Sequence, residues 1–197
     1  DLLDCSLRVW QAIIVYRSNK MLSRSLCLLI VLVIFFSSAY ADSQQGSAVY
    51  QFRLISLEMA SKAAWGAIND CRNRGYSVAA AVVDRGGNIQ VQLRDRFAGP
   101  HTSETAYRKA WTANSFRQST AELAGMLEER RIPDQVANNP GALLVGGGLT
   151  IEAGGEILGG IGISGAPPGK SERDSIDGAC AMAGLETVRE TLEFADE

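Results

Sequence analysis

The alternation of hydrophobic and polar positions predicts a mixture of helices and strands. After Ser56, apolar residues return every three or four positions as far as Gly75, which is typical of an amphipathic helix with a serine cap and a closing glycine. Residues 78–83 form an unbroken apolar run, and residues 89–94 alternate apolar with polar. With the Asp- and Gly-containing turn at 84–88 between them, the two runs predict a β-hairpin.

Further helices and short strands follow this hairpin. Thr102 or Ser103 is expected to cap a second helix, and Ser119 begins a capping box for a third. The last helix is expected over 176–192. The three short apolar runs that are typical of strands are 143–145, 149–151 and 156–164.

The predicted order of elements is α-β-β-α-α-β-β-β-α. Hairpins favour antiparallel pairing of strands. The sequence therefore predicts an α+β fold in a single domain, with one five-stranded antiparallel sheet flanked by helices.

The N-terminal part of the chain carries a targeting pattern. The first methionine is Met21, and after it come Arg24, an apolar run over 26–36 and the small residues of the Ala39–Ala41 stretch. This is typical of a secretory signal peptide, because the apolar run is short for a transmembrane anchor. We therefore expect residues 1–20 to be upstream translated sequence, residues 21–41 to be the signal peptide, and residues 42–197 to form a periplasmic or secreted domain.

Composition and charge narrow the class of protein. The 197 residues are 46% hydrophobic and 21% charged, with a formal net charge of −3, which is globular composition. No cluster of Lys and Arg is long enough to bind along the phosphate backbone of a nucleic acid, so nucleic acid is not the expected partner. Cys71 and Cys180 are the two cysteines of the expected mature domain. They could pair in an oxidising compartment or remain as two buried thiols, and the sequence favours the thiols.

Glycine-rich patterns near the C-terminus do not predict a nucleotide site. Eleven of the 20 glycines lie between Gly141 and Gly169. The run 160–165 matches G-x-G-x-x-G, but it lies inside a predicted strand, and prolines rather than a helix follow it. Glycine at this density predicts close approach of backbone segments, bulges, or a ligand lying on the sheet.

His101 is the one histidine of the chain, so a His-rich zinc site is excluded. It lies in a loop just before a predicted helix. Two interpretations remain open for it: an exposed loop residue, or a functional group that is an axial ligand for haem iron or transfers a proton.

Residues from about 55 to 188 resemble the GlcG/HbpS family, the haem-degrading domain that also forms the C-terminal part of PduO-type proteins. The blocks that carry the resemblance are 82–88, 99–106 with 109–113, 140–148, and 160–167 with 180–184. The resemblance implies a five-stranded sheet with helices around it, homo-oligomers, and haem or another small ligand in some members. Many relatives are described as haem-degrading, but a fold label alone establishes no activity.

The resemblance also implies a ligand site. The family's Gly-Pro-x-Thr loop corresponds to Gly99, Pro100, His101 and Thr102. His101 stands at the variable position of this motif, so its role as an iron ligand is our inference and not part of the resemblance. Thr102 is the competing candidate, as an oxygen ligand to iron or as the helix cap. The basic residues expected to pair with haem propionates are Lys109, Arg85 and Arg96. No catalytic residue is identified; if a reaction is catalysed, oxidative haem breakdown is the expected one.

The leading hypothesis is therefore an exported protein that binds or handles haem, with no membrane span after signal cleavage. A second hypothesis is an enzyme or accessory protein of carbon metabolism that binds a short hydroxy acid, whose carboxylate Arg or Lys would hold. A third is a structural oligomer or sensor subunit.

Overall fold

Four antiparallel strands form one sheet in the part of the chain that the structure describes, residues 52–169 and 175–195 of a computed structural model. The elements in chain order are α3 (Leu57–Asn73), β1 (Ala79–Asp84), β2 (Ile89–Arg94), α4 (Thr102–Phe116), α5 (Thr120–Glu128), the 3₁₀ helix η1 (Asp134–Asn138), β3 (Gly148–Ala153), β4 (Glu156–Ser164), α6 (Ile176–Glu186) and α7 (Arg189–Glu193). The strand order is β2-β1-β4-β3, so β2 and β3 are the edges. No helix in these ranges has the length and apolar character that a membrane crossing needs. The expected signal peptide, 21–41, lies outside the described residues.

The α+β class with an antiparallel sheet is confirmed, but the prediction of five strands is wrong. The segment 143–145 is not a strand, because backbone groups at its start form hydrogen bonds with side chains of α4. The Leu143 amide donates to Thr112 Oγ1 (2.8 Å), and Arg108 Nη2 donates to Ala142 O (2.7 Å). Thr112 and Arg108 both belong to α4. These backbone groups are therefore satisfied by side chains rather than by a neighbouring strand.

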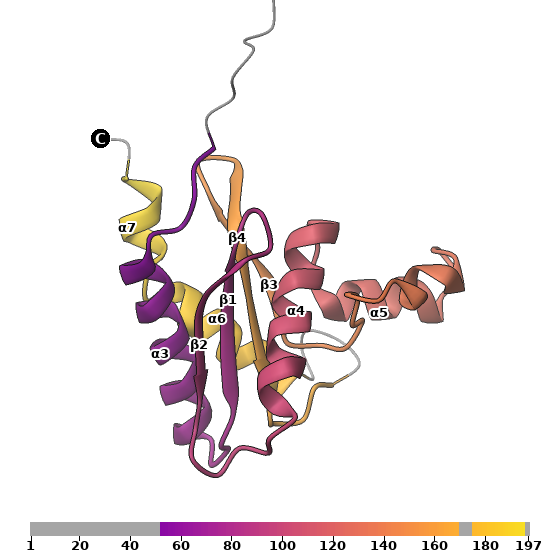
Figure 1. Cartoon of the computed structure of the whole chain (residues 1–197), viewed down its shortest axis with the longest axis horizontal. Helices are drawn as coiled ribbons and strands as arrows, with labels where there is room; N and C mark the ends of the chain where they lie inside the picture. The colour runs from indigo at the N-terminus through magenta and orange to yellow at the C-terminus, as the bar shows by residue number, and fades with distance from the viewer. Residues whose placement is uncertain (1–51, 170–174, 196–197) are drawn as a thin grey trace, which may run out of the picture. The chain divides into compact units, whose positions relative to one another are not determined.

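Helices cover both faces of the sheet (Figure 1). α3 and α6 pack against each other on one face, and α4 lies on the other. Side chains alternate along β1, so Ala80 and Val82 enter the larger core with α3 and α6, while Ala79 and Ala81 face α4. The main hydrophobic core therefore lies between the sheet and the α3–α6 pair, and α5 projects away beyond α4.

Glycines in β4 let the backbone of α4 lie directly on the sheet. A Cβ added at Gly162 would collide with the carbonyl oxygen of Ala106, and one added at Gly160 would collide with that of Ala110. Of the explanations expected for the glycine density, close backbone approach therefore applies here.

The serine caps predicted for two helices are confirmed. Ser56 and Ser119 each accept a hydrogen bond from the amide three residues ahead, at 3.3 and 3.1 Å. The expected last helix, 176–192, is instead divided into α6 and α7. It breaks where Thr187 ends α6 and donates its hydroxyl to Gly184 O at 2.7 Å.

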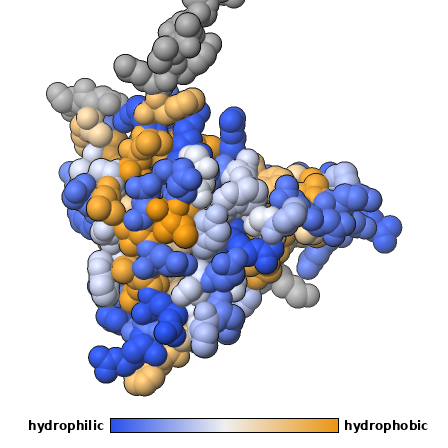
Figure 2. Space-filling view, in the orientation of Figure 1, coloured by the Kyte–Doolittle hydropathy of each residue, from blue (hydrophilic) through white to orange (hydrophobic). Residues whose placement is uncertain are grey.

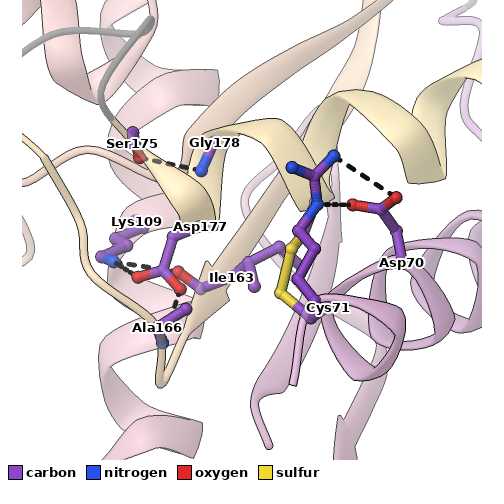
Figure 3. Close-up of a disulfide and its surroundings, with 10 residues drawn as sticks. Asp70, Cys71, Lys109, Ile163, Ala166, Ser175, Asp177 and Gly178 are labelled. Atoms are coloured by element: carbon purple, nitrogen blue, oxygen red, sulfur yellow. Dashed lines mark hydrogen bonds and ion pairs between the residues drawn. A yellow bond between two sulfur atoms is a disulfide. The ribbon is translucent and has the colours of Figure 1, made fainter. Parts of the chain in front are cut away.

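Cys71 of α3 and Cys180 of α6 form a disulfide, so the prediction of two buried thiols is wrong (Figure 3). Their Cα atoms are 5.5 Å apart, within bridging distance. The helices approach closely because their contact is lined by small residues; a Cβ at Gly184 would collide with Ala63 O. Both cysteines are fully buried.

Exposed apolar side chains gather on the face formed by α3 and β2 (Figure 2). The large hydrophobic residues of these two elements that are exposed are Leu57, Trp65 and Ile89. Because β2 is an edge of the sheet, this α3–β2 patch adjoins unpaired strand backbone. Such a patch is a surface suited to protein contact.

Candidate functional site

A short loop between β2 and α4 precedes the Gly-Pro-x-Thr motif and is anchored to its surroundings. The Asp95 amide donates to Val78 O (3.0 Å), and the Asp95 carboxylate accepts two bonds from Arg72, at 2.7 and 3.0 Å. The pKa of Asp95 is lowered chiefly by these bonds from the Arg72 guanidinium. Arg94 Nη1 donates to Ala98 O (2.6 Å). The loop is thus held by the residue before β1, by α3 and by β2.

His101 and Thr102, the two candidate iron ligands, have different surroundings. His101 and Pro100 are exposed, and the imidazole of His101 lies against Gly99, where an added Cβ would stand 2.7 Å from Cε1. Thr102 is 1% exposed, and its hydroxyl donates to Gly99 O at 2.7 Å. The imidazole is therefore accessible to a ligand from solvent, whereas the hydroxyl is held inside the loop.

The start of α4 differs from the prediction that Thr102 or Ser103 caps it. His101 is the N-cap residue, and its side chain makes no capping bond within the described ranges. Thr102 is already helical because its amide, as well as its hydroxyl, bonds to Gly99 O. The imidazole is thus not committed to the helix end.

Lys109 is buried and bonded inside the protein (Figure 3). Its Nζ donates to Asp177 Oδ2 (2.7 Å) and Ile163 O (2.9 Å), while Asp177 Oδ1 accepts from the Ala166 amide (3.0 Å). Both charged side chains are 1% exposed. Burial lowers the pKa of Lys109 and raises that of Asp177, and the attraction between them opposes both shifts. A haem propionate would have to displace Asp177 to reach Lys109, and this expected role stays a prediction.

Arg85 and Arg96 lie at opposite ends of β2. Arg85 belongs to the β1–β2 turn, where Asn114 near the end of α4 donates to its carbonyl (3.0 Å) and its guanidinium lies 5.2 Å from the Phe52 ring centroid. Arg96 is exposed in the loop that leads to His101. The strand between them spans about 20 Å. Of the two arginines, the fold therefore brings Arg96 to the histidine loop and not Arg85.

Two cavities open along β3, the sheet edge opposite to β2. The larger, about 440 Å³, lies between the start of α5, β3 and the α6–α7 pair, and is called the β3-edge groove below. Its lining residues are Arg117, Gln118, Ser119, Glu122, Leu149, Thr150, Ile151, Glu152, Met182, Leu185, Arg189, Leu192 and Glu193. The smaller, about 170 Å³, is lined by Ala121, Gly147, Gly148, Leu149, Ser175, Gly178, Ala179 and Met182. The two share Leu149 and Met182, and neither is lined by the histidine loop.

Sequence reasoning missed this groove and its central methionine. Met182 stands among small residues, between Ala181 and Ala183 on α6, and is 46% exposed. A large flexible side chain within the run of small residues at 178–184 was the one local signal. The groove itself depends on how α5 and α6 flank β3, which spacing along the chain does not indicate.

A family model described as haem degrading protein HbpS-like matches residues 55–186. The chain belongs to this family. A crystal structure of a double mutant of HbpS from Streptomyces reticuli is 37% identical to this HbpS-like protein, covers 74% of it and 94% of that chain, and superimposes with a TM-score of 0.65. The resemblance inferred from the sequence motifs is thereby confirmed.

Two further relatives of this HbpS-like protein are more distant. A crystal structure described as a PduOC:heme complex is 24% identical, covers 68% of this chain and 94% of that one, and has a TM-score of 0.61, which shows a shared fold. A 15.0 kDa protein from the dhaT–dhaS intergenic region of Citrobacter freundii is 29% identical over 128 residues, 64% of this chain and 88% of that protein.

Proposed function

We propose that this HbpS-like protein is exported and handles haem by sensing, sequestering or degrading it. The observation that carries the proposal is the match of the haem-degrading family over residues 55–186. A protein of the same fold crystallised as a haem complex supports it. Haem would supply an iron that takes an axial ligand from the protein.

The histidine loop offers groups that fit haem. The His101 imidazole is exposed and uncommitted to the helix cap, and Arg96 in the same loop is an exposed cation for a propionate. Gly99 leaves room for the imidazole, because an added Cβ would collide with it. These features favour His101 over Thr102 as the loop's iron ligand.

A periplasmic or secreted location is part of the proposal. The disulfide between Cys71 and Cys180 supports it, because structural disulfides persist mainly in oxidising compartments. The signal peptide expected at residues 21–41 would direct the export.

We also propose that the protein is a homo-oligomer, as the family resemblance implies. The exposed α3–β2 patch and the open edge of β2 support this, since a second copy would cover apolar surface and unpaired backbone together. The mass of the protein in solution is the quantity that tests it.

Titration of the full chain with hemin tests the haem proposal. We expect a saturable shift of the Soret band at one haem per chain or per dimer. A site that uses the histidine loop further predicts that His101→Ala alters the band, because an exposed imidazole would be lost. Glu104→Ala, an exposed change one turn into the same helix, is the matched control and should leave the band unchanged.

The absence of a saturable shift would contradict haem binding. The family assignment and the fold would stand, and short hydroxy acids would become the ligands to test. Thr102→Ala is a poor probe of ligation, because it also removes the bond that holds the loop at Gly99.

A further inference from the structure

We propose that the β3-edge groove binds an extended peptide segment of another protein, which lies beside β3 as an added strand. Apolar residues of this segment alternate with lysine or arginine. The site is independent of haem, because the histidine loop follows β2 at the opposite edge of the sheet. Three features carry the proposal: the open backbone of β3, the helices on both sides of this edge, and the charge of the groove.

The backbone of β3 has positions that point away from β4, toward the outer edge of the sheet. The Gly148 amide donates to Thr120 Oγ1 (2.8 Å), so Gly148 points outward, whereas the Gly147 carbonyl oxygen accepts from the Ile163 amide of β4 (2.9 Å). Outward and inward positions alternate along an antiparallel strand. Thr150, two residues after Gly148, therefore also points its N–H and C=O groups outward.

Thr120 of α5 closes one end of this edge and leaves the rest open to the groove. The register shift after Ile151 skips a residue of β4 and none of β3, so Glu152 keeps the outward position. Thr150 and Glu152 both line the groove, and no strand among residues 52–169 and 175–195 lies beside them. An added strand forms its main-chain hydrogen bonds with outward groups of this kind.

Helices flank the open edge on both faces of the sheet. The end of α4 and the start of α5 form one wall of the groove, and the α6–α7 pair forms the other. The edge of a folded domain would bring its own helices against these walls; β2, the other open edge of this chain, is itself covered by α3. A single extended segment has no such helices. The walls and the volume of about 440 Å³ therefore favour a short peptide strand.

The two faces of β3 determine which side chains of the segment meet each wall. Ile151 points into the core with α6, whereas Thr150 and Glu152 point to the face of α4, where Thr150 Oγ1 donates to Glu152 Oε1 (2.7 Å). Residues opposite each other on paired strands share a face. Alternate residues of the segment would therefore contact Met182, which is 46% exposed, and the half-buried Leu185. The residues between them would meet the polar wall.

The charge of the groove favours basic residues at the polar positions of the segment. Glutamates outnumber arginines among its charged lining residues, which are Arg117, Glu122, Glu152, Arg189 and Glu193. Arg189 is already paired with Glu186, outside the groove, at 2.7 Å. Glu122 and Glu152 are both exposed on the side of α5. Lysine or arginine would pair with them, and because exposed ion pairs are weak, the backbone bonds and apolar contacts would supply most of the affinity.

Titration of the full chain with a short, capped, fluorescein-labelled peptide of alternating lysine and valine tests the proposal. We expect saturable binding by fluorescence anisotropy and slower hydrogen exchange of the amides at 150–152. The same residues in two blocks, lysines first and valines second, should bind roughly tenfold more weakly, because they cannot match both walls. No saturable binding, or binding without protection of these amides, would overturn the proposal.

A proline variant tests the backbone bonds. Thr150→Pro removes an outward N–H and should raise Kd roughly two- to tenfold, the effect of one hydrogen bond. Proline is tolerated where the N–H of an edge strand faces outward. Gln92→Pro, the same change at an outward position of β2, is the matched control and should leave Kd unchanged. Equal effects of the two prolines would contradict an added strand at β3.

A charge-reversal variant tests the groove without altering the backbone. Glu122→Lys/Glu152→Lys should weaken the lysine–valine peptide and strengthen a glutamate–valine peptide, each roughly two- to tenfold. Glu128→Lys/Glu129→Lys makes the same change of net charge at exposed positions outside the groove, and should affect neither peptide. Equal shifts in both variants would mean that binding follows net charge, which would overturn the assignment to the groove.

The mass of the protein in solution, measured with and without the peptide, separates another protein from a second copy as the occupant. We expect the peptide to leave the oligomeric state unchanged. An oligomer that the peptide dissociates would show that a second copy occupies this edge, and would overturn the assignment to another protein. The hemin titration is a separate measurement, so failure of the peptide site leaves the haem proposal as it was.

Discussion

Reduction of the Cys71–Cys180 disulfide is expected to lower the free energy of unfolding by about 2–5 kcal/mol. The bridge joins residues 109 apart in sequence, so it removes a large share of the conformations open to the unfolded chain. It also connects α3 to α6, the two helices that enclose the larger core with the sheet. Since both cysteines are fully buried, we expect reduction to require partial unfolding of this pair.

Urea unfolding of the same protein with and without reductant measures the effect without substituting any residue of the core. The variant Cys71→Ala/Cys180→Ala should resemble reduced wild type and no longer respond to reductant. Cys5→Ser/Cys27→Ser is the control for the other two cysteines of the chain, and its response to reductant should equal that of wild type. Equal unfolding midpoints for oxidised and reduced wild type would contradict the prediction.

The features that the sequence predicted correctly are local ones. The caps at Ser56 and Ser119 depend on a side chain and an amide three residues apart, so the residue pattern alone specifies them. The hairpin from β1 to β2 likewise depends on two adjoining apolar patterns and the turn at 84–88. The family motifs added a prediction that these local elements assemble into an α+β fold.

The features that the sequence missed depend on contacts between distant segments. The run 143–145 is as apolar as a strand, yet its neighbourhood bonds to Thr112 and Arg108 on α4. Two isolated cysteines do not indicate whether the helices that carry them are adjacent. The close approach of α3 and α6 depends on Gly184, where any side chain would collide with Ala63 O. Propensity and periodicity describe neither kind of contact.

The candidate site was predictable only in part for the same reason. The loop from Gly99 to Thr102 is continuous in sequence, so its residues were found together. Lys109 was expected to be free for a ligand, but its partner, Asp177, is 68 residues away and comes near only when α6 returns to α4. The β3-edge groove requires four separate elements, α5, β3, α6 and α7.

Breaking the Lys109–Asp177 pair is expected to be at least as damaging as losing the disulfide. Lys109→Met leaves a carboxylate buried without its cation, and Asp177→Asn leaves a buried ammonium without its anion. Each single change should lower the free energy of unfolding by about 3–5 kcal/mol. The double variant Lys109→Met/Asp177→Leu removes both charges and should be more stable than either single variant, because no unpaired charge remains buried.

The two single variants should respond to pH in opposite directions. In Lys109→Met, Asp177 loses the cation that lowers its pKa, so its folded pKa rises further above the ordinary 3.8. The folded state then binds the proton more tightly than the unfolded state, and the loss of stability is small below 3.8 and grows as pH rises through the raised pKa.

In Asp177→Asn, the folded pKa of Lys109 falls further below 10.5, because the carboxylate that raises it is gone. The folded state then binds the proton less tightly, so the loss is fully present below the lowered pKa and shrinks as pH rises toward 10.5. Urea unfolding of wild type and both variants across pH measures the two curves, with the double variant as the reference without either charge. Parallel curves for the single variants would mean that neither buried charge is left unpaired, and that solvent reaches the site between α4 and α6.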